Sequence, residues 1–445
     1  MAVAAHGTGG DEAASVPTSS AGAKLIDDAG MNRFLKKIIF LSSGGSFLDG
    51  YVLSLIGVAL VQLAPALGLS QPEVAATGAA ALAGIFFGSL AGGRLTDALG
   101  RRTMFILDVS AIGVASVAAC FVDAAWQLIA LRFLLGFFIG ADYPIATSLI
   151  AEFSPRKERA LSMGIVSGAW YLGATAAAFV GYGLYSVTDG WRWMLGSALI
   201  PCIVLLIGRH DIPESPRWLR QRGRVEEAKQ VMIKVFGSAV ELGDEAPTKA
   251  GFASVFRSGY AARVLFLGVL ILCQVVPMWA MYTFGPMIMS AFGLGEGSLS
   301  VLGEALVSLF FLIGTVPAMF WLNSLGRRPL LLGSLALMAI GLLIPGLWPT
   351  AHVVVIIAAF ALYAFFSGGP GILQWLYPNE MFPTEVRATA VGVAIAISRI
   401  GVVISTYGLP IFLDAYGIGP TMLTGAGLLV LAWGAVGAGF VAGIA

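Results

Sequence analysis

The sequence predicts an all-α membrane protein whose twelve transmembrane helices form two similar six-helix halves. Three observations lead to this expectation. Of the 445 residues, 58% are hydrophobic and only 11% are charged, whereas soluble domains carry about 25% charged residues. The apolar residues fall into runs of about 20, the length that a helix needs to cross a bilayer. Finally, two polar motifs recur at corresponding places in the two halves.

The apolar runs follow one another with mostly short polar connections. In chain order they cover residues 37–63, 74–97, 103–122, 127–149, 161–184, 190–208, 264–290, 298–322, 329–348, 352–376, 389–413 and 419–443. Segments of alternating polarity, which a β-barrel would show, do not occur. We therefore expect a disordered cytosolic tail (1–31), a first six-helix bundle (32–208), a cytosolic linker (209–262) and a second six-helix bundle (263–445).

The basic residues predict the orientation in the membrane. Loops 65–73, 291–299 and 414–418 contain no Lys or Arg, so they should face outward and both termini should lie in the cytosol. This describes a multi-pass protein of the plasma membrane, or of the cytoplasmic membrane in a bacterium. The three cysteines lie in apolar runs without metal or redox spacing. We expect no metal, no cofactor, no enzymatic activity and no nucleic-acid partner, and a monomer in the lipid bilayer.

Two motifs repeat between the halves. GGRLTDALGRRT (92–103) follows the second run and WLNSLGRRPLL (321–331) follows the eighth. EFSPRKERA (152–160) follows the fourth run and EMFPTEVRA (380–388) follows the tenth. An even number of spans in each half makes the two copies parallel, related by an axis along the membrane normal.

These motifs carry a family resemblance. GRLTDALGRR resembles the loop 2–3 signature of the major facilitator superfamily. RFLLGFFIG (132–140), PESPRWL (213–219) and EMFPTEVRATA are similar to its sugar porter branch and to the related carriers of organic anions and cations. The resemblance extends from about residue 32 to 443. It implies a substrate cavity between two bundles and alternating access by rocking of the halves.

The charged residues of these loops are expected to form a network that closes the cytosolic end when the cavity faces outward. The alternative is that they are solvated charges that only set the topology. The residues are Asp97, Arg101, Arg102, Glu152, Arg159, Glu214, Arg217, Arg327, Arg328, Glu380 and Arg387.

Six ionisable residues fall inside the apolar runs: Asp49, Asp108, Arg132, Asp142, Glu304 and Arg399. Each costs about 2.5–3.5 kcal/mol or more at the bilayer centre, so such residues usually face a cavity and have a partner. Asp108 is close along the chain to Arg101 and Arg102, which favours a structural role. Glu304 lies near the outer end of its run, where we expect it to reach water.

Asp49 is the candidate proton carrier. It lies 12 residues beyond Lys37, which places it about 18 Å into the membrane as a helix residue. In the proton-coupled sugar porters that the chain resembles, an Asp of the first span pairs with an Arg of the fourth, here Arg132. GADYPIATSLIAEF (140–153) also resembles the fourth span of proton-coupled phosphate carriers, which makes Asp142 the other candidate partner. The alternative is that Asp49 is a static hydrogen-bonded residue.

Arg399 is the candidate substrate-binding charge, because its guanidinium cannot lose its proton and requires an anion. It lies at the same depth as Asp49, 12 residues beyond Arg387. In the organic-ion carriers that the chain resembles, an Arg at this place goes with anionic substrates. The alternative is a packing Arg that donates to backbone carbonyls. Further candidate contacts are aromatic or amide side chains: Tyr51, Trp170, Trp279, Tyr282, Trp375, Gln274 and Gln374.

The sequence thus favours a secondary active transporter, a proton symporter that imports a small organic anion such as a carboxylate with an aromatic part. A sugar or polyol symporter is the first alternative. It is weakened because Pro277 and Trp279 stand where sugar porters have Gly and Asn. A phosphate symporter, a drug or organic-cation carrier and a non-transporting membrane sensor are the remaining alternatives.

Overall fold

The computed structural model describes residues 33–153, 156–236, 260–293, 297–382 and 384–441, and the expected tail lies outside these ranges. The described residues form α-helices and no strand, and twelve of the resulting segments are long and apolar enough to cross a membrane. Each of the twelve coincides with one of the predicted apolar runs. The predicted fold class is therefore confirmed.

The first bundle contains six spans, the last of which is built from two consecutive helices, α7 and α8. Its helices are α2 (Arg33–Ala66), α3 (Gln71–Leu99), α4 (Arg101–Ala119), α5 (Ala125–Phe153), α6 (Arg156–Leu184), α7 (Gly190–Ser197) and α8 (Leu199–Arg209). Arg209, which the sequence placed in the linker, is the last residue of α8.

The second bundle also contains six spans, of which the fourth is divided into α15 and α16. Its helices are α12 (Ala261–Ala291), α13 (Ser298–Ser324), α14 (Arg327–Leu347), α15 (Val353–Phe366), α16 (Gly368–Met381), α17 (Thr384–Tyr416) and α18 (Ile418–Val441). In α12 the backbone at Phe284 leaves the helical region (φ −131°, ψ 21°) between Pro277 and Pro286. A kink is expected there because a proline inside a helix removes a hydrogen bond and clashes with the preceding turn.

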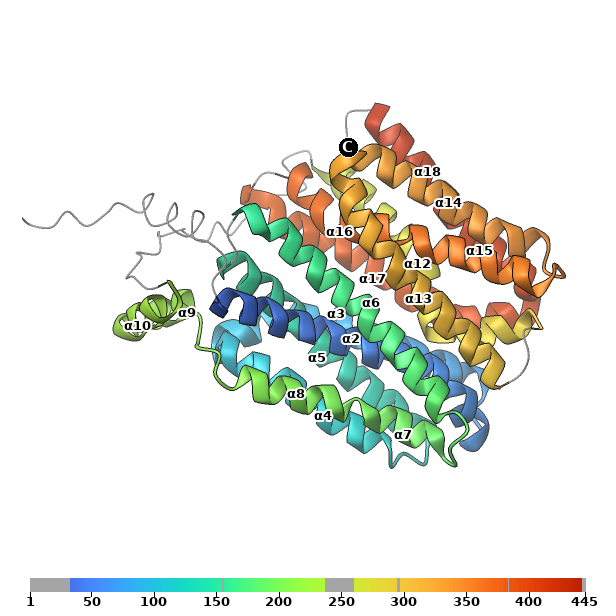
Figure 1. The fold of residues 1–445 in the computed structure, drawn as a ribbon, viewed down its shortest axis with the longest axis horizontal. Helices are drawn as coiled ribbons and strands as arrows, with labels where there is room; N and C mark the ends of the chain where they lie inside the picture. Colours follow the sequence, from blue (N-terminus) through green and yellow to red (C-terminus); the bar gives the residue numbers. More distant parts are fainter. Residues whose placement is uncertain (1–32, 154–155, 237–259, 294–296, 383, 442–445) are drawn as a thin grey trace, which may run out of the picture.

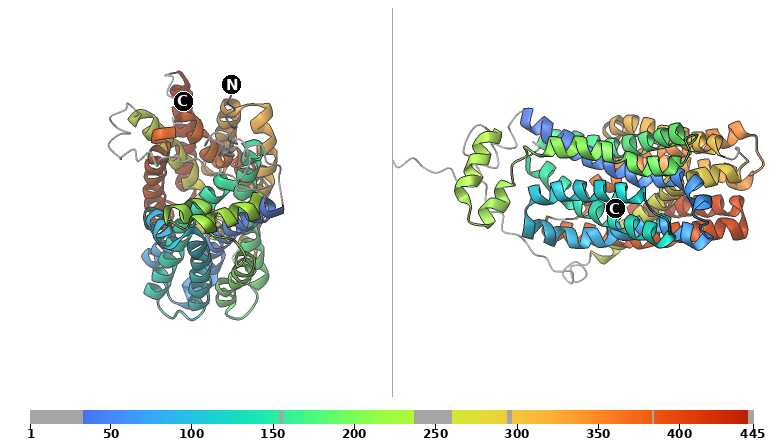
Figure 2. Two further views of the ribbon diagram at one scale, coloured as in Figure 1. Left: turned by 90° about the vertical axis from the view of Figure 1, so that its left-hand side faces the viewer. Right: turned by 90° about the horizontal axis from the view of Figure 1, so that it is seen from below.

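Two short helices, α9 (Pro216–Gln221) and α10 (Val225–Phe236), connect the bundles. They project beyond one end of the long helices, and the two bundles lie side by side (Figures 1 and 2). We call this the basic end, because it also carries the turns that begin α4 with Arg101 and Arg102 and begin α14 with Arg327 and Arg328. The other end is called the opposite end.

Glycines allow close contacts between spans that position the candidate site. A Cβ at Gly50 of α2 would lie 2.0 Å from the Trp170 carbonyl oxygen of α6, and one at Gly173 would lie 1.9 Å from the Phe47 oxygen. Only a residue without a side chain permits such backbone contact between membrane helices. Asp49 and Trp170, one on each helix, are therefore held close to this crossing.

The two bundles meet in the half nearer the opposite end. A Cβ at Gly57 of α2 would lie 2.7 Å from the Tyr282 carbonyl oxygen of α12. A Cβ at Gly78 of α3 would lie 2.6 Å from the Phe284 ring. The bundles are thus in contact at backbone distance on this side of the candidate site.

Candidate functional site

The first bundle buries a group of charged side chains that we call the carboxyl cluster: Asp49 of α2, Asp108 of α4, Asp142 of α5 and Arg209 of α8. Their side chains are at most 3% exposed, and Arg209 is completely buried. The cluster brings together two of the predicted proton-coupling residues, Asp49 and Asp142. Arg209 was missed because it ends an apolar run, where the sequence suggested a loop charge.

Arg209 is bonded on several sides. Its Nη1 lies 3.4 Å from each carboxylate oxygen of Asp108 and donates to the Phe105 carbonyl oxygen at 2.6 Å. Its Nη2 donates to the Leu41 carbonyl oxygen at 3.4 Å, and its guanidinium carbon lies 3.3 Å from the centre of the Phe105 ring. Asp108 therefore has a structural contact, as expected, but to Arg209 rather than to Arg101 or Arg102.

Asp49 and Asp142 complete the cluster. The charges that act on Asp49 are those of Asp142 and Arg209, and Asp142 also acts on Asp108. A Cβ at Gly45 would lie 2.5 Å from Nη2 of Arg209 and 2.9 Å from Oδ2 of Asp142. Because Gly45 has no side chain, Arg209 and Asp142 both fit against α2 one turn before Asp49. Three carboxyl groups therefore surround one guanidinium, and Asp108 is the one that is paired with it among the described residues.

Arg132 lies elsewhere in the first bundle. It is 3% exposed and its Nη1 donates to the Val52 carbonyl oxygen at 3.1 Å, while its Nε has no hydrogen-bond partner among the described residues. The expected Asp49–Arg132 ion pair is not formed in this structure. The Arg132 guanidinium is bonded instead to the backbone of α2 three residues beyond Asp49, whereas Asp142 lies near Gly45, four residues before Asp49.

At the junction of the bundles six rings form what we call the aromatic group: Trp170, Tyr171, Trp279, Tyr282, Phe311 and Tyr363. The ring of Trp170, from the first bundle, lies edge-on to Trp279 at 5.6 Å and to Tyr282 at 5.0 Å, both from the second. Phe311 joins Tyr282 at 5.0 Å and Tyr363 at 5.7 Å. Three predicted residues are thus brought together, whereas Tyr171, Phe311 and Tyr363 were missed.

Arg399 of α17 lies at the edge of the aromatic group. Its guanidinium carbon is 5.9 Å from the centre of the Trp279 ring, and its side chain is half-buried. Among the described residues it has neither a hydrogen bond nor an ion pair. A cation–π contact alone leaves its five N–H donors available to an anion.

Several polar atoms of this region are buried without a hydrogen-bond partner among the described residues: Nε1 of Trp279, the hydroxyls of Tyr282 and Tyr363, and Oε2 of Glu304. Glu304 was expected to reach water, but its side chain is only 3% exposed. It turns inward because α12 has no side chain at Gly285, where a Cβ would lie 2.4 Å from Cγ of Glu304. Buried polar groups usually have a hydrogen-bond partner, so each of these unpaired atoms requires an explanation.

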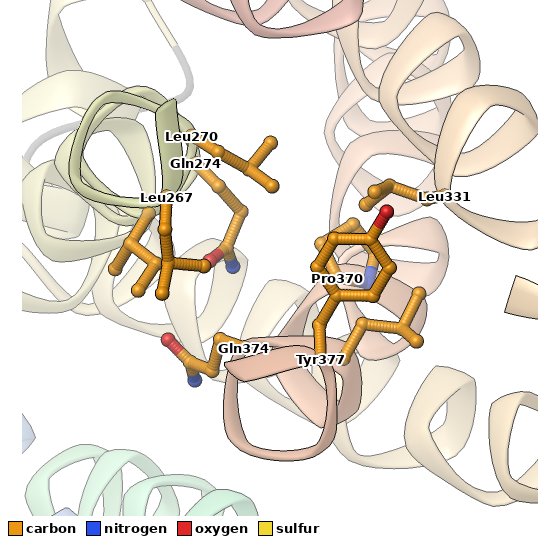
Figure 3. Close-up of a pocket in the computed structure, with 9 residues that line it drawn as sticks. Leu267, Leu270, Gln274, Leu331, Pro370, Gln374 and Tyr377 are labelled. Atoms are coloured by element: carbon orange, nitrogen blue, oxygen red, sulfur yellow. The ribbon is translucent and has the colours of Figure 1, made fainter. Parts of the chain in front are cut away.

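The two predicted glutamines line a narrow cavity between α12, α14 and α16 (Figure 3). The amide nitrogen of Gln274 is buried without a partner among the described residues, whereas Gln374 donates to the Gly371 carbonyl oxygen at 3.1 Å. Tyr51 does not join the aromatic group. Its hydroxyl lies 2.6 Å from Oγ of Ser197, and its ring stacks on Phe47.

At the basic end, Glu214 contacts the first signature turn through the backbone. It accepts hydrogen bonds from the amides of Arg101 at 2.8 Å and Arg102 at 3.1 Å, where α4 begins. A carboxylate is favourable at this position because a helix N-terminus carries partial positive charge. Arg102 also donates to the His210 carbonyl oxygen at 2.8 Å. Glu214 thus ties the connection between the bundles to the loop that follows the second span.

The structure describes only some of the remaining residues of the predicted gating network. Arg327 and Arg328 are exposed at the start of α14. The following side chains, including one predicted substrate contact, lie outside the described part of the structure: Asp97, Glu152, Arg159, Arg217, Trp375, Glu380 and Arg387.

Comparison with known proteins identifies the family. Residues 37–442 match the family model described as "Sugar (and other) transporter". The chain therefore belongs to this family, the sugar porter branch of the major facilitator superfamily, and is a secondary transporter rather than an enzyme.

Relatives cover nearly the whole chain. It is 52% identical over 403 residues to the putative metabolite transport protein YaaU of Escherichia coli, covering 91% of each chain. It is 34% identical over 409 residues to the inner membrane metabolite transport protein YgcS of the same organism, again covering 91% of each. Its fold is similar to the E. coli xylose transporter XylE in a partially occluded inward-open conformation. That match has a TM-score of 0.77 at 22% identity and covers 90% of this chain and 97% of the other.

Proposed function

We propose that the protein is a proton symporter that imports a small organic anion, a carboxylate with an aromatic part, by alternating access. Arg399 is the observation that carries this proposal. It is a permanent cation within the membrane-spanning region, it lies beside the ring of Trp279, and it has no anionic partner among the described residues. A substrate carboxylate would provide that partner through two parallel hydrogen bonds.

The carboxyl cluster supports the proton-coupled part of the proposal. Burying several like charges around one guanidinium is unfavourable, and a proton bound by one carboxyl relieves the repulsion. Asp49 is our candidate for this carboxyl, because it belongs to α2, which also contacts the second bundle at Gly57. Asp142 and Arg132 would tune the exchange.

We further propose that the basic end faces the cytosol and that the protein acts as a monomer in the plasma membrane, or in the inner membrane of a bacterium. The absence of Lys and Arg from three loops of the opposite end supports this orientation. In this orientation the charged residues of the basic end, Glu214 with Arg101 and Arg102 among them, would act as the cytosolic gate.

A sugar:proton symporter is the second candidate. It is favoured by the likeness in fold to XylE, which is described as a proton:xylose symporter, and by the unpaired amide of Gln274. An amide in a narrow cavity is well suited to a sugar hydroxyl, because it both donates and accepts hydrogen bonds.

Uptake into proteoliposomes with an inward proton gradient tests the two candidates. Labelled aromatic and aliphatic carboxylates are compared with a hexose, phosphate and an organic cation. Arg399→Ala should weaken carboxylate binding about 10- to 100-fold, the value of a hydrogen-bonded charge. Arg263→Ala is the matched control, because Arg263 is also half-buried and lies 5.7 Å from the Tyr260 ring. It should leave uptake unchanged.

Coupling is tested with Asp49→Asn, with the exposed Asp414→Asn as its control. Asp49→Asn should abolish accumulation driven by the proton gradient but retain exchange of substrate across the membrane. Hexose accumulation that Arg399→Ala retains would establish the second candidate and make Arg399 a packing residue.

A further inference from the structure

We propose that Glu304 is a second polar anchor of the substrate site. The substrate is then an organic anion that carries a hydroxyl or amino donor at the end remote from its carboxylate. This inference rests on the proposed function, since it concerns the same site, and it goes further by specifying the substrate at both of its ends.

Glu304 has one carboxyl oxygen that is fixed by a hydrogen bond and one that is available to a ligand. One oxygen, Oε1, accepts a hydrogen bond from the Ser308 hydroxyl at 2.8 Å, which fixes the orientation of the carboxyl group. The other oxygen, Oε2, is buried and has no partner among the described residues. A buried carboxyl oxygen without a hydrogen bond is unfavourable, and a donor on the substrate would remove this penalty.

The neighbouring tyrosines point to the same conclusion. The hydroxyls of Tyr282 and Tyr363 are both buried without a hydrogen-bond partner among the described residues. The rings of Tyr282 and Tyr363 both pack on Phe311 of α13, which lies two turns from Glu304 on the same helix, so these polar groups lie in one region of the second bundle. Three polar groups of the second bundle, each from a different helix, thus lack a hydrogen-bond partner among the described residues. A single packing defect does not explain all three. Together they form a polar subsite with two acceptor-and-donor hydroxyls and one carboxyl.

The positions along α12 give the spacing between the two anchors. Arg399 lies over Trp279, and Glu304 packs on Gly285, six residues further along the same helix. Six residues of an unbroken helix span about 9 Å, and the kink at Phe284 lies within this stretch. Between these levels lies Tyr282, against which the Trp170 ring packs at 5.0 Å. A substrate that places its carboxylate at Arg399 would therefore present its far end to Glu304, with its apolar part along these rings.

Two matched pairs of probes test the proposal on the purified full-length protein by isothermal titration calorimetry. The aromatic pair is 3-(4-hydroxyphenyl)propanoate and 3-phenylpropanoate, and the aliphatic pair is 6-hydroxyhexanoate and hexanoate. In each pair only one member has a hydroxyl at the far end. We expect at least one hydroxylated probe to bind about tenfold more tightly than its partner.

Glu304→Gln should reduce this preference to threefold or less while leaving the unsubstituted acid bound as in the wild type. Glu73→Gln, at a half-buried carboxylate in the first turn of α3, is the control and should retain the preference. Thermal unfolding and size-exclusion profiles equal to the wild type show that Glu304→Gln is folded. Ser308→Ala provides a second test, because it leaves the carboxyl in place but removes its orienting bond, and should weaken the preference partly.

The outcomes separate this inference from the proposed function. Equal binding within both pairs, or a preference that survives Glu304→Gln, overturns the role of Glu304 but leaves the carboxylate transporter intact. If none of the four acids binds while a hexose does, the proposed function and the second anchor are both wrong.

Discussion

The carboxyl cluster of the first bundle and the Glu304 and Arg399 region of the second bundle differ in how their charged groups are paired. In the carboxyl cluster of the first bundle, Arg209 contacts Asp108, two backbone carbonyls and the Phe105 ring, so a buried cation and a buried anion contact one another there. In the second bundle Glu304 and Arg399 each lack an ionic partner among the described residues. The carboxyl cluster thus contains an ion pair without any ligand, although Nε of Arg209 and Oδ1 of Asp142 have no hydrogen-bond partner among the described residues. In the proposed function, a bound substrate would complete the second arrangement.

This difference supports the proposed roles of the two bundles, with proton binding in the first and substrate binding in the second. A proton needs little space, so a compact group of carboxyls around one guanidinium can bind it without a cavity. A substrate needs donors and acceptors that are free before it arrives. Trp170 is the exception to the division, because it belongs to the first bundle but packs on Trp279 and Tyr282 of the second. It places the proposed substrate site at the interface between the bundles.

Removing the cation of the carboxyl cluster should have the largest effect. Arg209→Ala leaves three buried carboxyls without their guanidinium and is expected to lower the free energy of unfolding by about 3–5 kcal/mol. Thermal unfolding in detergent would measure the loss. Arg224→Ala is the control, since Arg224 is exposed and pairs with the exposed Glu227. The exposed pair should contribute less than about 1 kcal/mol. Equal losses of unfolding free energy in both variants would show that the buried cluster stabilises the first bundle no more than an exposed ion pair does.

The signature turns extend the comparison to the basic end. Gly100 (φ 96°, ψ 155°) and Gly326 (φ 83°, ψ 170°) both occupy a backbone region open essentially to glycine alone. At Gly100 a Cβ would also lie 2.5 Å from Oε2 of Glu214, whereas at Gly326 it would meet nothing within 4 Å.

Alanine should therefore cost about 1–3 kcal/mol of unfolding free energy at either turn, and more at Gly100 because it also displaces Glu214. The two variants are compared by thermal unfolding with Gly93→Ala, an exposed helical position where an added Cβ meets nothing. A larger loss at Gly326 than at Gly100 would contradict the contact with Glu214.

Double-mutant cycles can show which arginine acts on Asp49. Asp49→Asn combined with Arg209→Met should deviate from additivity by about 0.5–3 kcal/mol, because the two groups belong to one cluster. The same change combined with Arg132→Met should be additive within about 0.5 kcal/mol. Unfolding free energies in detergent give both values. If the larger coupling involves Arg132, the pairing suggested by the family resemblance dominates in the detergent-solubilised state.

Substitutions at two tyrosines should have the smallest effects on the unfolding free energy, and the two effects should differ in sign. Tyr51→Phe removes a hydroxyl that is bonded to Ser197 and should lower the unfolding free energy by about 1 kcal/mol. Tyr282→Phe removes an unpaired hydroxyl, so stability should be unchanged or slightly higher while substrate affinity falls. Unfolding and binding measured on the same preparations test both. A loss of stability in Tyr282→Phe as large as that in Tyr51→Phe would mean that its hydroxyl has a partner in the ligand-free protein.

Much of the candidate site could be read from the sequence, because an ionisable residue in an apolar run is conspicuous. Asp49, Asp142 and Arg399 were identified in this way, and Trp170, Trp279 and Tyr282 by their mid-span positions. Their partners could not be identified. Asp108 was assigned to the neighbouring Arg101 and Arg102, but it contacts Arg209, about a hundred residues further along the chain.

The sequence by itself determined that the chain crosses a membrane twelve times in two related halves, since hydrophobicity and motif repetition are local properties of the chain. Only the tertiary structure decided which charges meet. Whether Asp49 faces Arg132 or Arg209, and whether Glu304 faces water or α12, depends on how each helix is rotated and how deeply it is shifted against its neighbours. Glycines such as Gly45 and Gly285 set those positions because they allow close contact between segments that are distant in the sequence. Such contacts cannot be predicted from one apolar run alone.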